Sequence, residues 1–394
     1  MDDFIHIPKA SGSTLRTVLS QQYGGEHVFY YEPDNPIWRD RDSTAALERA
    51  IATQTITLLT GHHKFGLHSV LKTPIRYFSM LRDPISRAIS DYYYAYSYQH
   101  HRLREEILRG DLAAEDYLTS KRFGLFDAQC AMLVGDWSSE SRSANVAYEL
   151  AERSFVAVGV TEYFDESLLY IAKQLGWRPP LYVTRNVTKL PSDIAAERNR
   201  VEEAARKNHS HFYDLDLDLH DRVTRLLLHR IEDEGSAFSN ALAAYREMQR
   251  VLEKSNDKEK FNLFEFGRTD AAHLDFAGLA ESEPYRVVED YLRASSAPKA
   301  PPKNYAGALD TAAGRIIAGW ALDLFNKEPI EVRIYRSGVQ VGAARCAGNR
   351  QDVAHTAWTR ADVGFHVELS EEIANPREVR VCFEDSSIPL SRMF

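Results

Sequence analysis

The stretch of sequence that decides the fold is Asp3-Phe4-Ile5-His6-Ile7-Pro8-Lys9-Ala10-Ser11-Gly12-Ser13-Thr14-Leu15-Arg16-Thr17-Val18-Leu19. Its largely apolar start, at residues 4–7, predicts a short strand buried on both faces, as in a parallel sheet. Pro8 cannot continue a central strand, so the chain must turn there. Residues 10–14 are all small, and the apolar residues within 15–19 recur at helical spacing. The stretch therefore predicts a strand, a tight loop and a helix.

The predicted loop has the features of an anion-binding site. The first turn of a helix carries unpaired backbone N–H groups and a partial positive charge, and small side chains let an anion approach them. Ser11, Ser13 and Thr14 add hydroxyl groups, and Lys9 adds a full positive charge. Alternatively, this is an ordinary strand-to-helix turn whose serines cap the helix. It is not the P-loop of nucleotide hydrolases, because that motif places its lysine after the loop and not before it.

Further apolar, β-branched runs predict strands at residues 55–60, 75–81 and 155–160. Helical stretches separate these runs, which predicts an α/β fold with a doubly wound parallel sheet. Lys9, His62 and Arg82 each stand just past a strand end, and such sheets bind ligands beyond the carboxyl ends of their strands. We therefore expect three strands to deliver polar groups to one edge of the sheet.

Helices are predicted by capping signals and by periodicity. Asp83 followed by Pro84 is a helix start, because it combines an N-cap oxygen with a proline at the first helical position. A second helix is expected near residues 44–52. Residues 200–255 are predicted to be helical. Within them, a core-facing stripe is expected at Leu242, Tyr245, Met248 and Leu252.

Length and composition indicate a soluble globular protein with room for two domains. The chain has 394 residues, of which 44% are hydrophobic and 27% charged. Its net charge of −9 argues against nucleic acid as a partner, since such binding draws on clustered positive charge. No run approaches the roughly 18 apolar residues of a membrane-spanning helix. The acidic start, with no targeting segment, favours a bacterial cytoplasmic location, unless the chain is a piece trimmed from a longer protein.

Metal and disulfide chemistry are not expected. The pair His62-His63 is followed by no third ligand at motif spacing, so no metal site is predicted. The three cysteines, Cys130, Cys346 and Cys382, are odd in number and lack metal-ligand spacing, which fits a reducing compartment. Cys346 and Cys382 could face each other in the second domain, but free thiols are favoured.

The C-terminal part has a different pattern. Residues 295–303 are rich in proline and form a stiff linker by composition. Beyond them, apolar and polar residues alternate, which predicts a small antiparallel β-sandwich. We expect three regions: the α/β domain at 1–235, a helical extension with the linker at 236–303, and the β-sandwich at 304–394. The aromatic residues of the β-sandwich could stack on sugar rings or fill the core, and the core is favoured for Trp320. These residues are Trp320, Tyr335, Trp358 and Phe365.

Three motifs together resemble one enzyme family. Residues 6–15 resemble the 5′-phosphosulfate loop of sulfotransferases that use 3′-phosphoadenosine 5′-phosphosulfate (PAPS), most closely the carbohydrate branch that includes the uronyl 2-O-sulfotransferases. Residues 82–94 resemble the 3′-phosphate motif of the same enzymes. Gly61-His62 is similar to the pair that supplies their catalytic histidine. The resemblance spans about residues 3–230 and includes shorter fragments at 126–129, 155–162 and 185–188. The C-terminal region resembles an accessory module of bacterial glycan-modifying enzymes.

This resemblance implies a P-loop-type fold, a substrate and a set of roles. The donor would be PAPS, no metal would be needed, and the acceptor would be a carbohydrate hydroxyl. His62 would be the general base of an in-line attack, and Lys9 would stabilise the leaving group. The cofactor-binding residues would be Pro8, Lys9, Ala10, Ser11, Gly12, Ser13, Thr14, Arg82 and Ser90. Relatives usually have threonine where Ala10 stands. The alternatives are a P-loop kinase, or a non-catalytic glycan-binding protein with a vestigial nucleotide site.

Overall fold

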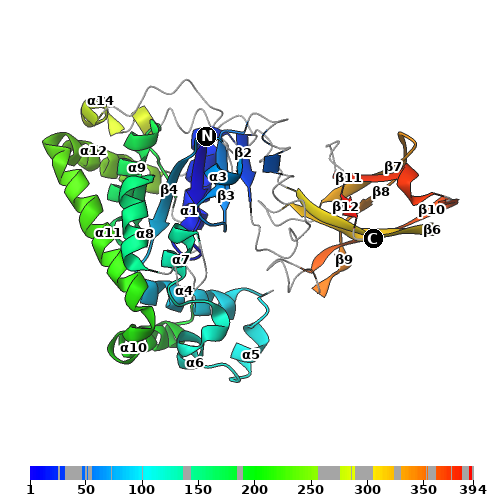
Figure 1. The fold of residues 1–394 in the computed structure, drawn as a ribbon, viewed down its shortest axis with the longest axis horizontal. Helices are drawn as coiled ribbons and strands as arrows, with labels where there is room; N and C mark the ends of the chain where they lie inside the picture. Colours follow the sequence, from blue (N-terminus) through cyan, green and yellow to red (C-terminus); the bar gives the residue numbers. More distant parts are fainter. Residues whose placement is uncertain are drawn as a thin grey trace. The chain divides into compact units, whose positions relative to one another are not determined.

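The computed structural model describes residues 1–24, 27–31, 47–48, 51, 56–71, 73–99, 101–135, 143–183, 190–255, 276–284, 286–288, 305–323, 330–351, 353, 361–373, 375–383 and 390–392. The chain forms two compact units (Figure 1). The first comprises residues 1–32, 44–97 and 109–301, and the second comprises 302–394 with the segments 33–43 and 98–108. Residues 236–301 thus belong to the first unit, while the predicted boundary at residue 235 stays a prediction. The linker at 295–303 lies outside the described residues.

The first unit is built on a five-stranded sheet whose described pairings are all parallel. Its strands lie in the order β2 (Val28–Tyr30), β3 (Leu58–Gly61), β1 (Asp2–Ile5), β4 (Arg76–Leu81) and β5 (Phe155–Val160). β1 lies at the centre, where Ile5 pairs with Gly61 on one side and Ser79 on the other. The carboxyl ends of β1, β3 and β4 therefore meet at one edge. This confirms the α/β fold class.

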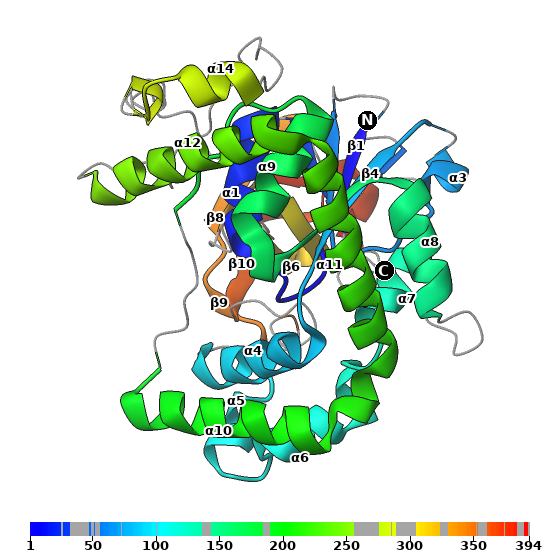
Figure 2. The same cartoon turned by 90° about the vertical axis from the view of Figure 1, so that its left-hand side faces the viewer.

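Both faces of the sheet are covered. Successive strand residues point to opposite faces, and the neighbours Leu58 and Leu59 of β3 join two different hydrophobic clusters. The helices of this unit are α1 (Gly12–Tyr23), α3 (Leu67–Leu71), α4 (Pro84–Ser97), α6 (Ala114–Thr119), α7 (Ala128–Val134), α8 (Ala144–Arg153), α9 (Phe164–Leu175), α10 (Ser192–Asn208), α11 (Asp214–Asp233), α12 (Gly235–Lys254) and α14 (Phe276–Glu281), with short 3-10 turns at 121–123, 161–163 and 210–213. Figure 2 shows α9 and α11 crossing in front of the sheet.

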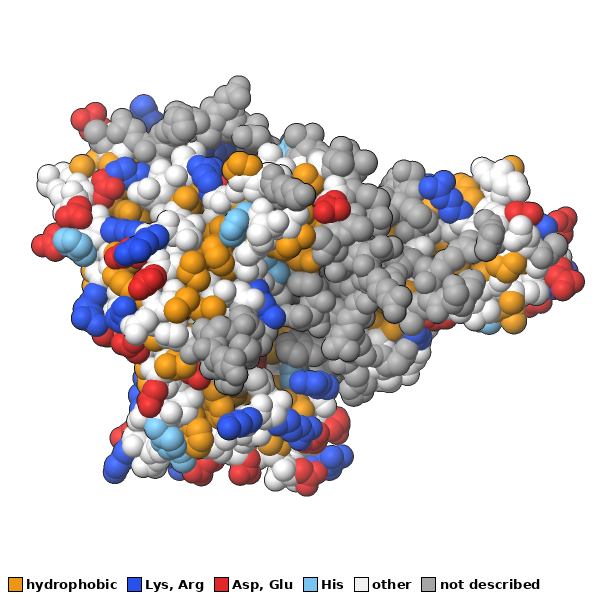
Figure 3. Space-filling view, viewed as in Figure 1, with side chains coloured by type: hydrophobic (Ala, Val, Ile, Leu, Met, Phe, Trp, Pro, Cys, Tyr) orange, Lys and Arg blue, Asp and Glu red, His pale blue; other side chains and the backbone are white. Residues whose placement is uncertain are grey.

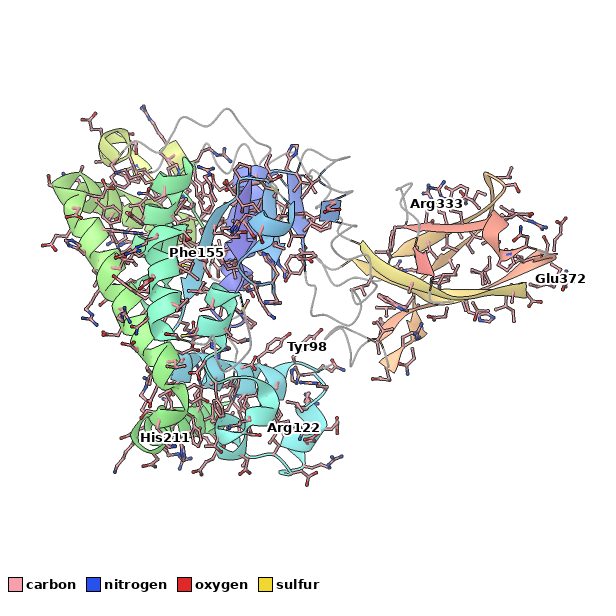
Figure 4. The ribbon with its side chains drawn as sticks, viewed as in Figure 1. Tyr98, Arg122, Phe155, His211, Arg333 and Glu372 are labelled. Atoms are coloured by element: carbon pink, nitrogen blue, oxygen red, sulfur yellow. The ribbon has the colours of Figure 1, made fainter. Side chains whose placement is uncertain are left out.

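The large core lies between the sheet and helices α1, α8, α9, α11 and α12. Phe155, labelled in Figure 4, opens β5, and its ring centroid lies 5.7 Å from that of Tyr77. The predicted stripe on α12 is confirmed at Tyr245, Met248 and Leu252, whose side chains are fully buried. The remaining residue of the stripe, Leu242, packs at the margin of the core.

The second unit contains an all-β sandwich, as predicted, and the short helix α5 (Arg104–Leu108). One sheet has the order β12 (Ser391–Arg392), β6 (Tyr305–Asp323), β10 (Asp362–Ile373) and β9 (Gly348–Asn349); the other has β11 (Val379–Phe383), β7 (Glu331–Arg336) and β8 (Val339–Arg345). The pairings are antiparallel except that β12 runs parallel to β6. A shared core joins the two sheets.

Several predictions about side chains are settled in this second unit. Trp320 is 4% exposed and packs against Ala308 and Val363, which confirms it as a core residue. Phe365 is also buried, and Tyr335 is half-buried on β7, beside Arg333, which Figure 4 labels. Trp358 lies outside the described residues. All three cysteines are buried and carry thiols rather than a disulfide, in agreement with the expectation from the sequence.

Charged side chains of both signs mix on the surface of the first unit. Figure 3 shows Lys and Arg interspersed with Asp and Glu over the face that carries α11 and α12. In the described part of the chain, no helix is long and apolar enough to cross a membrane.

Candidate active site

The loop between β1 and α1 holds two non-glycine residues in the left-handed region. Lys9 has a φ of 67° and Ser11 a φ of 61°. Such conformations cost on the order of 1–3 kcal/mol each and cluster at ligand-binding sites. The N–H of Ala10 donates to the carbonyl of Ile7 at 3.2 Å, which closes a tight turn. The chain therefore bends sharply where α1 begins, as in the backbone loops that bind anions.

Ser11 precedes α1 but its side chain does not cap the helix. Its hydroxyl donates to Thr161 Oγ1 at 3.2 Å, and Thr161 donates to the carbonyl of Leu81 at 3.0 Å. This ties the loop to the ends of β4 and β5. The first turn of α1 contains no acidic residue, so the positive end of the helix is not neutralised by its own sequence. Ser11 therefore does not act as the helix cap that the alternative interpretation requires.

The other predicted loop residues differ in exposure. Pro8 and Lys9 are half-buried, Ser13 is exposed and Thr14 is buried. Ala10 is fully buried and packs into the hydrophobic core. The position where relatives usually carry a threonine hydroxyl is therefore apolar and inward-facing in this chain.

Gly12 is required by the ring of His6. A Cβ atom at position 12 would lie 1.6 Å from His6 Nε2, so any other residue would collide with the ring. That ring lies between Phe4 and His62, with centroid distances of 5.7 and 4.3 Å. Burial lowers the pKa of His6 well below its usual value, and the charges of His62 and Arg16 lower it further. His6 is thus a neutral packing residue beside the loop.

His62 is oriented by the backbone of β1. Its Nδ1 lies 2.8 Å from the carbonyl oxygen of His6. A carbonyl oxygen can only accept, so Nδ1 carries the proton and the neutral ring has its lone pair on Nε2. His62 is half-buried and directly follows β3. This is the tautomer that a general base needs.

His63 points away from the loop, and its ring is buried between Asp3 and the backbone of Tyr31. It is 1% exposed, its Nε2 lies 2.8 Å from Asp3 Oδ1, and its Nδ1 lies 3.3 Å from the carbonyl of Tyr31. Because both partners accept, both ring nitrogens are satisfied only when the ring is doubly protonated. Consecutive residues at a strand end point to opposite sides, so the two neighbouring histidines have different surroundings.

Arg82 connects the end of β4 to the loop. Its Nη1 donates to the carbonyl of Lys9 at 3.0 Å, and burial lowers the pKa of its guanidinium. The Lys9 ammonium lies 3.9 Å from the ring centroid of Tyr94 on α4, a cation–π contact. Ser90 and Tyr94 are four residues apart, so they share the face of α4 that looks toward Lys9.

Gln129 and Asp216 form a buried hydrogen-bond network with the backbone of Arg82. Gln129 accepts from the N–H of Arg82 at 3.0 Å and donates to its carbonyl at 2.8 Å. The buried Asp216 accepts from the N–H groups of Gln129 and Cys130, at 3.1 and 2.8 Å. Burial raises the pKa of Asp216. The fragment at 126–129 resembles the family in sequence, but no local pattern indicates that Gln129 binds the backbone of Arg82.

The start of α4 is held by a charged network that the sequence did not indicate. Asp83 accepts from the N–H of Ser86 at 2.8 Å, which confirms the predicted N-cap, and it binds Arg206 of α10 through both oxygens. Burial raises the pKa of Asp83, but the bonds from Arg206 and Ser86 outweigh it and the pKa is lowered overall. Glu162 accepts from the N–H of Asp83 at 2.9 Å.

The structure thus brings Lys9, His62 and Arg82 together around residues 6–12, with Ser90 on the adjoining face of α4. The segment 185–188 lies outside the described residues. Among the described residues, no group of three or more His, Cys, Asp or Glu side chains gathers as metal ligands would.

Comparison with known proteins identifies the family. The family model described as galactose-3-O-sulfotransferase matches residues 9–261. Two solved structures are similar: mouse sulfotransferase SULT7A1 complexed with PAP (14% identity, 53% of this chain and 66% of that chain, TM-score 0.30) and retinol dehydratase in complex with androsterone and inactive cofactor PAP (16%, 52% and 63%, 0.24). No curated protein matches. The closer likeness to the uronyl 2-O branch stays a prediction. Because its model covers more than half of the sequence, the chain belongs to the galactose-3-O-sulfotransferase family.

Proposed function

We propose that this protein transfers the sulfuryl group of PAPS to a hydroxyl group of a carbohydrate. The observation that carries the proposal is the convergence of Lys9, Arg82 and His62 on one strained loop at the carboxyl edge of the sheet. Membership of a family named for sulfation of galactose supports a sugar acceptor.

The loop fits the 5′-phosphosulfate of the donor. Its backbone bends at Lys9 and Ser11, and the first turn of α1 offers N–H groups with no acidic side chain beside them. Lys9 supplies the compensating charge. The Lys9 ammonium now lies over Tyr94 and would turn toward the bridging oxygen between phosphorus and sulfur. There it would stabilise the negative charge that develops on this oxygen as its bond to sulfur breaks.

His62 fits the role of general base. The acceptor hydroxyl oxygen attacks sulfur and forms the new oxygen–sulfur bond, while the sulfur bond to the 5′-phosphate oxygen breaks. The hydroxyl proton passes to Nε2 of His62, which the Nδ1 contact with the His6 carbonyl leaves as the basic nitrogen. The products are the sulfate ester and 3′,5′-diphosphoadenosine (PAP). The atoms and charges balance without any further reactant.

The donor is tested first by binding. Isothermal titration should give tighter binding of PAP than of 5′-AMP or ATP, because the 3′-phosphate meets Arg82 and Ser90. Equal affinity for ATP would favour a kinase. Transfer is then tested with labelled PAPS and β-galactosides or uronic-acid oligosaccharides as acceptors. PAP binding with no transfer to any sugar would leave a vestigial nucleotide site and overturn the enzymatic proposal.

A further inference from the structure

Helix α10 runs antiparallel along α4, and two contacts set the register. Asp83, just before α4, accepts from Arg206 at 2.8 Å, and Ser86 donates to Glu202 at 2.7 Å. A step forward along α4 therefore corresponds to a step back along α10. Figure 2 shows the two helices running alongside each other at the lower end of the first unit.

The next turn brings Arg198 level with Ser90. Residues four apart lie on the same helix face, so the step from Ser86 to Ser90 matches the step from Glu202 to Arg198. The electrostatics agree that this part of α10 lies near α4. Burial raises the pKa of Tyr93, which follows Ser90 by three residues on α4, and the charges of Arg198 and Arg200 both oppose that rise.

Arg198 is also an electrostatic neighbour of Arg82. Burial lowers the pKa of the Arg82 guanidinium, and the charge of Arg198 lowers it further, while the carboxylates of Glu162, Glu202 and Asp83 oppose this. Arg198 is half-buried, and within the part of the chain that the structure describes, no acceptor is hydrogen-bonded to it. Like charges near an anion-binding loop repel each other, and an anion bound between them offsets that repulsion.

We propose that Arg198 is a third ligand of the 3′-phosphate of the donor, facing Arg82 and Ser90 across that group. The inference rests on the proposed function, since it assumes that PAPS binds with its 3′-phosphate at the start of α4. It adds a residue that no motif in the sequence indicated, from a helix more than 100 residues along the chain from Arg82.

The chemistry of the group suits two arginines. A phosphate monoester carries close to two negative charges at neutral pH, and each guanidinium offers five N–H donors in a planar fork. The Lys9 carbonyl accepts from only one donor of Arg82. A second guanidinium on the opposite side would complete the charge balance, with the Ser90 hydroxyl as a further donor. Arg198 would then select for donors that carry a 3′-phosphate.

The test measures the affinity for PAP and for 5′-AMP by isothermal titration in the full-length protein. Arg198→Ala should weaken PAP binding about 10- to 100-fold, as expected for lost hydrogen bonds to a charged group. Binding of 5′-AMP should change less than about threefold. Arg198→Lys keeps the charge but loses the fork, so its loss should be intermediate.

Arg200→Ala is the matched control, because it removes the same charge from the same helix. Arg200 is exposed and lies about 200° around α10 from Arg198. It should leave the affinities for both nucleotides unchanged. The assignment would be overturned if Arg198→Ala and Arg200→Ala lost the same affinity for PAP. It would also be overturned if Arg198→Ala lost as much affinity for 5′-AMP as for PAP.

The wild-type protein and Arg82→Ala separate this inference from the proposed function. If the wild type does not prefer PAP to 5′-AMP, both proposals fail. If it does, and Arg82→Ala abolishes the preference while Arg198→Ala keeps it, only the role of Arg198 fails.

Discussion

The side-chain amide of Gln129 forms hydrogen bonds with both backbone groups of Arg82. The Oε1 atom accepts from the N–H of Arg82 at 3.0 Å, and the Nε2 atom donates to its carbonyl at 2.8 Å. Gln129 is fully buried, and Asp216 holds its own N–H. A continuous chain of hydrogen bonds thus runs from α11 through α7 to Arg82 and, through its guanidinium, to the carbonyl of Lys9.

Gln129→Glu tests whether this contact positions Arg82. An ionised glutamate can accept from the N–H of Arg82 but cannot donate to its carbonyl, so PAP should bind about tenfold more weakly at about pH 8. A protonated glutamate can do both, and burial raises a carboxyl pKa. The deficit relative to the wild type should therefore shrink as the pH falls to about 5.5, as measured by titration calorimetry at both pH values.

Gln129→Met is the control for that experiment, because it fills a similar volume and has no proton to gain. It should bind PAP weakly at both pH values. If Gln129→Glu and Gln129→Met show the same deficit throughout, the side chain acts by packing and the positioning role is wrong.

The edge of the sheet could be predicted from the sequence because its signals are local. An apolar run, a proline and a string of small residues fix the end of β1 within ten positions. His62 and Arg82 directly follow β3 and β4, and Lys9 lies four residues past the end of β1. The strand alternation also implies that His62 and His63 face opposite ways. Which of the two faces the loop depends on the twist and pairing of β1 and β3, and the family spacing alone indicated His62.

The supporting contacts could not be predicted in the same way. Gln129 lies 47 positions from Arg82, and Arg206 lies 123 positions from Asp83. A buried glutamine or a surface arginine has no periodicity that points to its partner, because tertiary packing alone brings the two together. The parallel pairing of β12 with β6 could not be predicted for a related reason, because a two-residue strand is too short to show alternation.

His62 and His63 should respond differently to alanine substitution. His62→Ala should keep the affinity for PAP and lower turnover about 10²–10⁴-fold, the usual range for a lost general base. His63→Ala leaves Asp3 buried without its partner, so it should lower the free energy of unfolding by about 3–5 kcal/mol while the folded fraction keeps its turnover. Steady-state kinetics and urea denaturation measure both. An inactive but stable His63→Ala protein would reverse the assignment.

The contact between Gly12 and His6 predicts a double-mutant rescue. Gly12→Ala places a Cβ atom 1.6 Å from His6 Nε2, so the ring must move and the loop with it. We expect PAP affinity to fall at least about tenfold and stability to drop by about 1–3 kcal/mol, as in other overpacked sites. His6→Ala removes the ring, so Gly12→Ala should cost much less in the His6→Ala background. Equal costs in both backgrounds would show that the loop, and not the ring, excludes a side chain at position 12.

The lowered pKa of His6 predicts a loss of stability on the acid side. Burial, with the charges of His62 and Arg16, puts the pKa of folded His6 well below the usual 6.5. Below pH 6.5, unfolded chains therefore bind a proton that the native state does not, and the free energy of unfolding falls as the pH falls. His6→Asn should remove this contribution, so the stability difference between wild type and variant should shift in favour of the variant between about pH 7 and pH 5. Urea denaturation across that range measures it. His211→Asn is the control, since His211, labelled in Figure 4, is exposed on its 3-10 turn. If His211→Asn changes the pH dependence as much as His6→Asn does, the acid sensitivity does not arise at the loop.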